Sequence, residues 1–287
     1  MIVGTIKART KVLPPHLSSF SFGILLFKKY HVFMPRKWTE HELLVAMNLY
    51  CRLPFGQFDQ SNKHIREIAE RMDRTPSSLS MKLCNLASLD SYHRDRGVKG
   101  LPGASKLDRK VWADFQQDWT GMAERSETAF ESLAGLNSIG TSEPEIVIDL
   151  PTGPSETERT VKTRRLQRFF RNTILASYEN KCALTGMAIP QLLVASHIIP
   201  WSENEERRAD PTNGLCLNVL HDKAFDRHLI TFDTDLRLVV SNALKTKDIP
   251  EFQSANFANL EGTKLNEPHR FAPDERALEE HRAIFAA

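Results

Sequence analysis

A stretch poor in apolar residues, 120–160, divides this sequence and limits how it can fold. Ser, Thr, Gly, Glu and Pro dominate the stretch, as in SETAFESLAGLNSIGTSEPEIVIDLPTGPSETERT. Such a segment buries too little apolar surface to offset the entropy of ordering it, so we expect an acidic linker. The two flanking regions, 34–119 and 161–287, must then form separate domains with separate cores.

Composition excludes several classes of protein for this 287-residue chain. The hydrophobic share of 41% and the charged share of 26% are those of an ordinary globular chain. Since no apolar run approaches the roughly 20 residues that span a bilayer, a membrane protein is excluded. The four cysteines lie far apart without a CxxC pair, which argues against a disulfide framework and a four-cysteine zinc site. We expect free thiols and a cytoplasmic location.

Charge is unevenly distributed, although the net charge is only +2. Residues 34–110 hold 14 Lys and Arg against 9 Asp and Glu, whereas residues 111–160 hold 2 against 10. Five basic residues and no acidic one follow within 161–171. Basic blocks on either side of an acidic one suit a nucleic-acid-binding protein. Solvated helix faces on a protein without such a partner would give the same pattern.

The first 33 residues show no lasting helical or strand periodicity. Their short apolar run, FSFGILLF, lacks a cleavage site and precedes Lys28 and Lys29, which argues against a secretory signal. A more regular segment begins at Met34. We therefore expect residues 1–33 to be a non-native or disordered extension, with translation starting at Met34.

Helical spacing of apolar residues begins after Thr39 and continues to about residue 119. Thr39 and Glu42 have the spacing of a capping box, and Thr75 before a proline predicts another helix start. The segment IREIAERMDRTPSSLSMKLCNL has the pattern of a helix-turn-helix. We expect Arg74 and Lys82 to contact DNA phosphates. Two packed helices are also common in proteins that never contact DNA.

An amphipathic basic helix is predicted after the linker, in TRRLQRFFRNTILASYENKCALTG. Its apolar residues recur at helical spacing, which places the arginines on the outer face. Because this helix leads toward a pair of histidines, we expect phosphate contacts from its basic residues, Arg164, Arg165, Arg168 and Arg171.

Two histidines and an asparagine mark the region that follows. The predicted order is a strand ending at His197, a loop with Asn213, a second strand, and a helix with His221. A hairpin packed on a helix can bring both histidines to one side, where one activates water and the other holds a divalent cation. Asn213 can lock the loop through hydrogen bonds to the backbone. The alternative is two unrelated histidines.

This segment resembles the HNH endonuclease family. It carries, in order, ASHIIPWS, DPTNGLCL and HDKAFDRHLI, within a region that runs from Arg168 to Ser241. The resemblance implies a ββα-metal fold with His197 as general base, Asn213 as the loop asparagine and His221 as the helix metal ligand. It also implies DNA as the partner and a divalent ion as cofactor, with Mg²⁺ expected and Mn²⁺ or Ni²⁺ as alternatives.

One position departs from this resemblance. Many HNH nucleases place Asp or His just before the base as a metal ligand, but here that residue is Ser196. A serine hydroxyl is a weak Mg²⁺ ligand, since this ion prefers carboxylates and water. Either water completes the shell around Ser196 and His221, or a carboxylate from Asp226 or Asp222 does. Asp226 has a second interpretation, as a residue that orients His197 or caps the helix.

The N-terminal helices resemble a region often found ahead of such nucleases in bacterial restriction-like proteins. We therefore predict an α+β protein with a helical DNA-binding module at 34–119, a linker, and an HNH nuclease domain at 161–287. The predicted activity is metal-dependent DNA cleavage, and the resemblance implies a role in restriction or phage defence.

Several alternatives and extensions accompany this prediction. The chain is either a nuclease, a non-catalytic DNA-binding regulator, or a nuclease switched by a ligand or partner that the N-terminal half senses. A homodimer is left open. Because the linker holds no candidate catalytic residue, a fragment that begins near Glu158 is expected to fold and nick DNA.

Overall fold

The structure is a computed structural model that describes residues 36–97, 103–133, 154–245 and 248–286. By its internal contacts, Pro35–Ala287 forms one compact unit. The expected extension, 1–33, lies outside the described ranges, as do residues 134–153 of the expected linker. Within the described ranges, no helix has the length and apolar character needed to cross a membrane.

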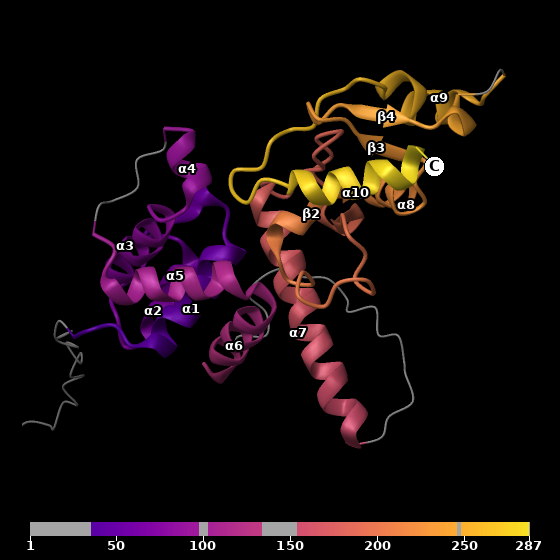
Figure 1. Cartoon of the computed structure of the whole chain (residues 1–287). Helices are drawn as coiled ribbons and strands as arrows, with labels where there is room; N and C mark the ends of the chain where they lie inside the picture. Colours follow the sequence, from indigo (N-terminus) through magenta and orange to yellow (C-terminus); the bar gives the residue numbers. More distant parts are fainter. Residues whose placement is uncertain (1–35, 98–102, 134–153, 246–247, 287) are drawn as a thin grey trace, which may run out of the picture. The chain divides into compact units, whose positions relative to one another are not determined.

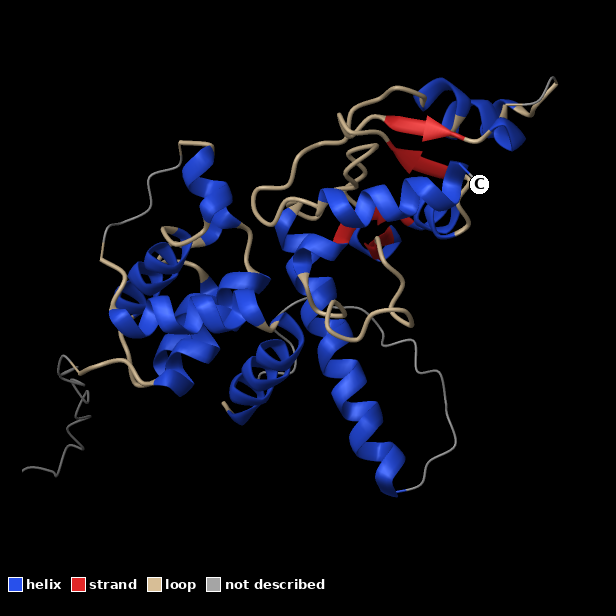
Figure 2. Ribbon diagram, viewed as in Figure 1, coloured by secondary structure: helices blue, strands red, loops and turns tan. Residues whose placement is uncertain are grey.

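Helices build the N-terminal half of the described structure (Figures 1 and 2). They are α1 (Glu40–Arg52), α2 (Lys63–Arg71), α3 (Pro76–Ala87), α4 (Ser91–Asp95), α5 (Lys106–Gln117) and α6 (Trp119–Ser132), with a 3-10 turn, η1 (Phe55–Gln57), after α1. Helix α1 is buried along most of its length because α3, α5, α6 and a later helix, α7 (Pro154–Ser177), pack around it.

Side-chain caps begin these helices where the sequence predicts. The Thr39 hydroxyl accepts a hydrogen bond from the Glu42 amide, and the Glu42 carboxylate accepts one from the Thr39 amide. Thr75 accepts from the Ser78 amide at the start of α3. These bonds satisfy backbone amides that have no partner inside the helix, which fixes where each helix starts.

Helix α6 occupies the first part of the segment whose composition predicts a linker. Its buried face includes Met122, Ala123, Ser126, Ala129 and Phe130, and it packs against α1 and α7. Small residues allow a close approach to α1, but they also give the segment the composition of a linker. The linker prediction is therefore wrong for residues 120–132, which are part of the helical core, and for residues 154–160, which belong to helix α7.

Helix α7 (Pro154–Ser177) is shared by two hydrophobic cores. Leu166 and Phe169 pack into the core of the N-terminal helices, whereas Phe170 and Ile174 pack into the core of the C-terminal half. Two adjacent phenylalanines on one helix thus serve different cores. A fragment that begins near Glu158 would expose the first of these faces, so the structure argues against the expectation that it folds alone.

A hairpin and a helix form the centre of the C-terminal half. Strand β1 (Leu193–His197) pairs antiparallel with β2 (Gly214–Asn218), which places His197 opposite Gly214. Helix α8 (Val219–Asp226) follows β2 directly and is capped by the Asn218 side chain.

The remaining elements complete an α+β fold, as predicted. A second antiparallel pair covers part of this half, and two helices and several 3-10 turns flank it. These elements are β3 (Ile230–Phe232), β4 (Leu238–Val240), α9 (Glu251–Asn256), α10 (Glu275–Ala286), η2 (Pro190–Leu192), η3 (Pro211–Asn213), η4 (Asn242–Leu244) and η5 (Ala258–Leu260).

A buried carboxylate, Glu127 on α6, ties α1 and α7 together. It accepts hydrogen bonds from Asn48 at 2.9 Å, from Arg52 at 2.6 Å and from Arg168 at 2.7 Å. Glu127 is fully buried, and the Arg52 side chain is only 4% exposed. A buried charge of this kind is tolerated because it is both paired and hydrogen-bonded.

We expect Glu127→Gln to destabilise the protein by about 3 kcal/mol, because it leaves the buried Arg52 without its counter-charge. Urea unfolding followed by circular dichroism measures this change in the free energy of unfolding. Glu131→Gln is the matched control, since Glu131 lies one turn later on α6, pairs with Arg165 and Arg168, and is 25% exposed. It should cost less than about 1 kcal/mol. Equal losses of unfolding free energy in the two variants would show that burial of the Glu127 cluster does not determine its contribution to stability.

Candidate functional site

His197 ends strand β1 and is held on three sides. Its Nε2 donates a hydrogen bond to the Arg208 carbonyl at 3.0 Å, since a carbonyl oxygen can only accept. The Phe170 ring stacks on the imidazole with centroids 3.7 Å apart, and Trp201 meets its edge at 5.6 Å. With the proton on Nε2, Nδ1 carries the lone pair and can accept a proton.

The surroundings of His197 keep it neutral. Burial lowers the pKa of His197 below its usual value, and the Arg208 carbonyl and the Asp226 charge only partly oppose this effect. A neutral imidazole with a directed lone pair is the form that a general base requires. The role predicted for His197 from sequence stays a prediction, and the geometry is compatible with it.

Asn213 locks the loop between the two strands. Its Oδ1 accepts from the Ile199 amide at 2.8 Å, and its Nδ2 donates to the Ile199 carbonyl at 3.1 Å. Nδ2 also lies 3.4 Å from the Arg207 carbonyl. Asn213 is 1% exposed, so these bonds are shielded from water. The side chain therefore holds the loop that presents the Arg208 carbonyl to His197.

His221, the helix residue predicted to hold a metal, faces the interior. Its Nδ1 accepts from Asn218 Nδ2 at 2.9 Å, and its Nε2 donates to the Asn256 carbonyl at 2.8 Å. The side chain is fully buried and meets Phe257 edge-on. Both ring nitrogens bond to protein atoms, which gives His221 a structural role in this arrangement, and its role as a metal ligand stays a prediction.

Two acidic residues on α8 lie on the neighbouring face of that helix, near His197. Asp222 and Asp226 are four residues apart, which places them on one side of a helix. Burial raises the pKa of Asp222, the Asp226 charge raises it further, and the Ser196 hydroxyl lowers it. Asp226 also acts electrostatically on His197. Asp222 and Asp226 thus lie near Ser196 and His197 of β1. We call the two carboxylates the α8 acidic face.

The α8 acidic face fits a hard divalent cation. Ser196 is 2% exposed, and among the described residues its hydroxyl oxygen makes no hydrogen bond of good geometry, although it lies close enough to Asp222 to lower the pKa of that carboxyl. Burial and, in addition, the charge of Asp226 raise the pKa of Asp222, and Asp226 has only a 3.7 Å contact with Lys223, so a divalent cation near both carboxylates would relieve their repulsion. Mg²⁺ in proteins uses one or two carboxylates and keeps several waters. Among the described residues no three His, Cys, Asp or Glu side chains already form a metal-binding group, so water and phosphate would supply the other positions.

The arginines of α7 are engaged within the protein. Arg165 and Arg168 pair with Glu131, and Arg168 also pairs with Glu127. Arg171 donates to the Leu193 carbonyl at the start of strand β1 and to the Pro190 carbonyl just before it. The structure therefore gives these three a structural role in place of the predicted phosphate contacts. Arg164 is exposed on α7 and remains a predicted DNA contact.

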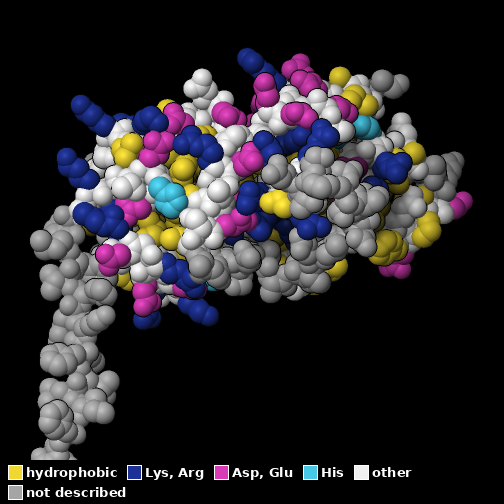
Figure 3. Space-filling view, turned by 90° about the horizontal axis from the view of Figure 1, so that it is seen from below, with side chains coloured by type: hydrophobic (Ala, Val, Ile, Leu, Met, Phe, Trp, Pro, Cys, Tyr) yellow, Lys and Arg dark blue, Asp and Glu magenta, His cyan; other side chains and the backbone are white. Residues whose placement is uncertain are grey.

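Arg74 and Lys82, the predicted DNA contacts of the helical half, are both buried. Arg74 is 6% exposed and binds Glu42 at 2.9 Å, and Lys82 is 6% exposed and binds Asp108 at 2.8 Å. Both cations lie over the Trp38 ring, at 4.0 and 4.9 Å from its centroid. The structure contradicts a direct phosphate contact for either residue. Figure 3 shows acidic side chains interspersed among the basic ones on the visible part of one face.

Comparison with known families agrees with the ββα arrangement. Residues 182–233, from the turn before β1 to the end of β3, match the family model described as HNH endonuclease. This part of the chain is therefore an HNH domain, and the resemblance noted in the sequence is confirmed. A search of curated proteins found no match.

We expect Arg74→Ala to act on folding and not on phosphate binding. Burial acts to raise the pKa of Glu42, but hydrogen bonds from Arg74 and Thr39 outweigh it and lower this pKa to about 2. A lowered pKa stabilises the native state above the ordinary value of 4.5, and this contribution is lost as the pH falls from 4.5 toward 2. Removing Arg74 should cost about 3 kcal/mol at pH 7 and flatten this acid dependence.

Thermal unfolding at pH 7 and pH 3 measures both effects. The matched control is Arg71→Ala, because Arg71 pairs with Glu67 on the surface of α2 with its side chain 34% exposed. That variant should lose less than about 1 kcal/mol and keep the acid dependence of the wild type. A stable Arg74→Ala protein with weakened DNA binding would restore the phosphate-contact prediction.

Proposed function

We propose that this protein is a metal-dependent DNA endonuclease that hydrolyses phosphodiester bonds with His197 as its general base. The observation that carries the proposal is the fixed tautomer of His197, whose Nδ1 lone pair is left for a proton beside the α8 acidic face. The HNH family match at residues 182–233 supports a nuclease-type function in general. DNA as the substrate, and a role in restriction or phage defence, rest on the resemblance to that family.

The chain supplies the base, its orientation and an acidic site for a cation. His197 takes the proton of the attacking water, while the Arg208 carbonyl keeps Nε2 protonated. Asn213 holds the loop that carries this carbonyl. Asp222 and Asp226, with Ser196, would hold a divalent ion, which when bound supplies positive charge to the scissile phosphate and leaving oxygen. We propose Mg²⁺ for this site, because two carboxylates and a hydroxyl are hard oxygen ligands.

Replacing the predicted base gives the first test of this function. His197→Ala should lower single-turnover cleavage of plasmid DNA by on the order of 10²–10⁴, because the proton acceptor is lost. Metal affinity and DNA affinity should change little. Cleavage that survives at the wild-type rate contradicts the role of His197. A wild-type protein that binds DNA but never nicks it, with Mg²⁺, Mn²⁺ or Ni²⁺, would favour the non-catalytic regulator.

The metal site is tested by comparing Asp222→Asn with His221→Asn. We expect Asp222→Asn to weaken Mn²⁺ binding, measured by calorimetry, by roughly 10–100-fold, because it removes a carboxylate of the α8 acidic face. His221→Asn should lower the melting temperature, since it breaks two buried hydrogen bonds, but leave Mn²⁺ affinity nearly unchanged in the folded protein.

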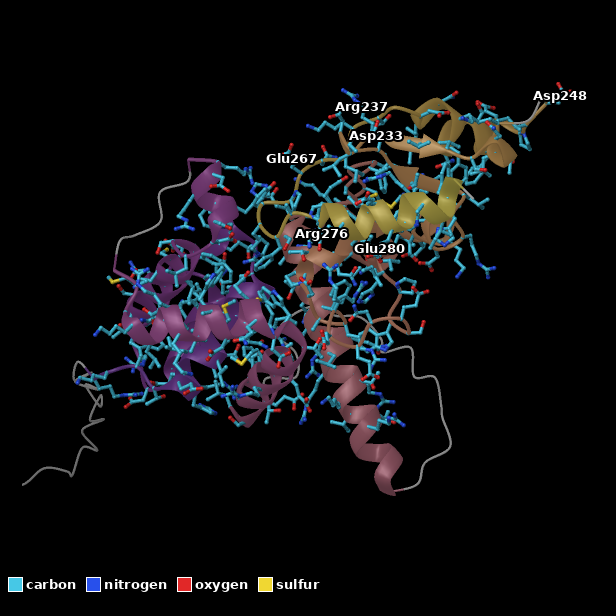
Figure 4. The ribbon with its side chains drawn as sticks, in the orientation of Figure 1. Asp233, Arg237, Asp248, Glu267, Arg276 and Glu280 are labelled. Atoms are coloured by element: carbon cyan, nitrogen blue, oxygen red, sulfur yellow. The ribbon has the colours of Figure 1, made fainter. Side chains whose placement is uncertain are left out.

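Asp235→Asn is the control for a change of charge alone. Asp235 is exposed in the turn between β3 and β4, where its amide donates to Asp233, one of the residues labelled in Figure 4. This variant should bind Mn²⁺ as the wild type does. If folded His221→Asn loses Mn²⁺ while Asp222→Asn retains it, the assignment of the metal site to the α8 acidic face is wrong.

A further inference from the structure

One face of the His197 imidazole is covered by the ring of Phe170. The two ring centroids are 3.7 Å apart and the planes are inclined by only 13°, a stacked arrangement. Phe170 is 2% exposed, so its ring is held by packing on every side. An aromatic wall at this distance restricts rotation of the imidazole about its bond to the strand. The ring stack and the hydrogen bond to the Arg208 carbonyl together fix the direction in which the Nδ1 lone pair points.

Gly214 provides the space that Phe170 occupies. It pairs with His197 across the hairpin, so a side chain here would stand next to the imidazole. A Cβ atom at Gly214 would lie 2.6 Å from Phe170 Cζ and 2.6 Å from Ile174 Cδ1, distances that real contacts do not reach. The backbone of Gly214 is extended, with φ −147°, a conformation that any residue adopts. The glycine is therefore required by space and not by backbone conformation.

The position of Phe170 is fixed by the rest of α7. Phe169, the preceding residue, stacks with Phe115 at 6.4 Å and lies 6.4 Å from Trp119 in the core of the N-terminal helices. Arg171, the next residue, donates to the Leu193 carbonyl at the start of β1. Contacts on both sides thus set the rotation of α7 relative to the hairpin.

We propose that Phe170 is a positioning residue for His197, and that Gly214 is free of a side chain so that the Phe170 ring can reach the imidazole. The inference rests on the proposed function in that His197 is taken as the general base. A base that can rotate away from its water loses alignment with the proton it must accept, and small misplacements of this kind reduce rates strongly. Phe170 touches neither water nor phosphate in this role and acts only through the orientation of His197.

Phe170→Leu and Gly214→Ala test this proposal in the full-length protein, with Phe169→Leu as the matched control. Phe169→Leu makes the same substitution one residue earlier, at a side chain of the same burial that serves the other core. Two readouts are used: the NMR signals of the His197 ring protons, assigned with His197→Gln, and the single-turnover cleavage rate at saturating DNA and metal.

We expect the stacked Phe170 ring to shift the His197 ring-proton signals upfield in the wild type. Phe170→Leu and Gly214→Ala should return these signals toward their ordinary positions and lower the cleavage rate by about 10–100-fold, with DNA affinity and the half-saturating metal concentration unchanged. Phe169→Leu should leave the His197 signals in place and the rate close to that of the wild type.

The outcomes separate this proposal from the proposed function. Wild-type protein that shows the upfield signals but no cleavage contradicts the nuclease function and leaves no reaction for Phe170 to serve. Active protein whose cleavage rate is unchanged in folded Phe170→Leu overturns the positioning role. An equal loss of rate in Phe169→Leu overturns it too, since general packing would then explain the effect. Should Gly214→Ala fail to fold, Phe170→Leu alone decides.

Discussion

The structure depends on one buried carboxylate, Glu127, and on the long helix α7 that it secures. Arg52 from α1 and Arg168 from α7 both donate to it, so three helices meet at a single charge. Loss of Glu127 would leave the buried Arg52 as an unpaired charge, and loss of Arg52 would remove the most buried cationic partner of Glu127. The Glu127 cluster fixes the first part of α7 against the N-terminal helices. The same helix then continues into the C-terminal half and places Phe170 on the imidazole of His197.

This arrangement explains why the basic residues of the sequence are poor guides to a DNA-binding surface. Arg74, Lys82 and Arg168 each have a carboxylate partner that is distant in sequence and close in space. Excess positive charge counted along a segment is therefore neutralised by acidic residues from other segments. The acidic segment 111–160 supplies one such partner, Glu127, for a cation at residue 168. The blocks of charge in the sequence form ion pairs between helices. Several of the residues predicted to contact DNA are therefore paired with carboxylates inside the protein.

The predicted metal site shows that the type of a single residue is also a poor guide to where it lies in the structure. His221 stands out in the sequence because of its residue type, yet it lies in register with Phe225, which is fully buried. Asp222 and Asp226 share the neighbouring face of α8, and their spacing of four residues was a signal of this in the sequence. The four-residue spacing on one helical face indicated which side chains lie near Ser196 and His197. The identity of a single residue did not. The pairing of His197 with Phe170 had no such signal, because 26 residues and a change of secondary structure separate them.

Local patterns in the sequence were enough to predict the α+β class, the caps at Thr39 and Thr75, the hairpin whose first strand ends at His197, and the loop bonds of Asn213. Each depends on neighbouring residues or on a periodicity that the backbone itself imposes. Tertiary structure alone decided that residues 120–132 form a core helix and that α7 serves two cores. It also decided which charges are buried and which nitrogen of His197 carries the proton. Those features depend on contacts between residues far apart in the chain, and close packing selects among partners that composition and spacing leave equivalent.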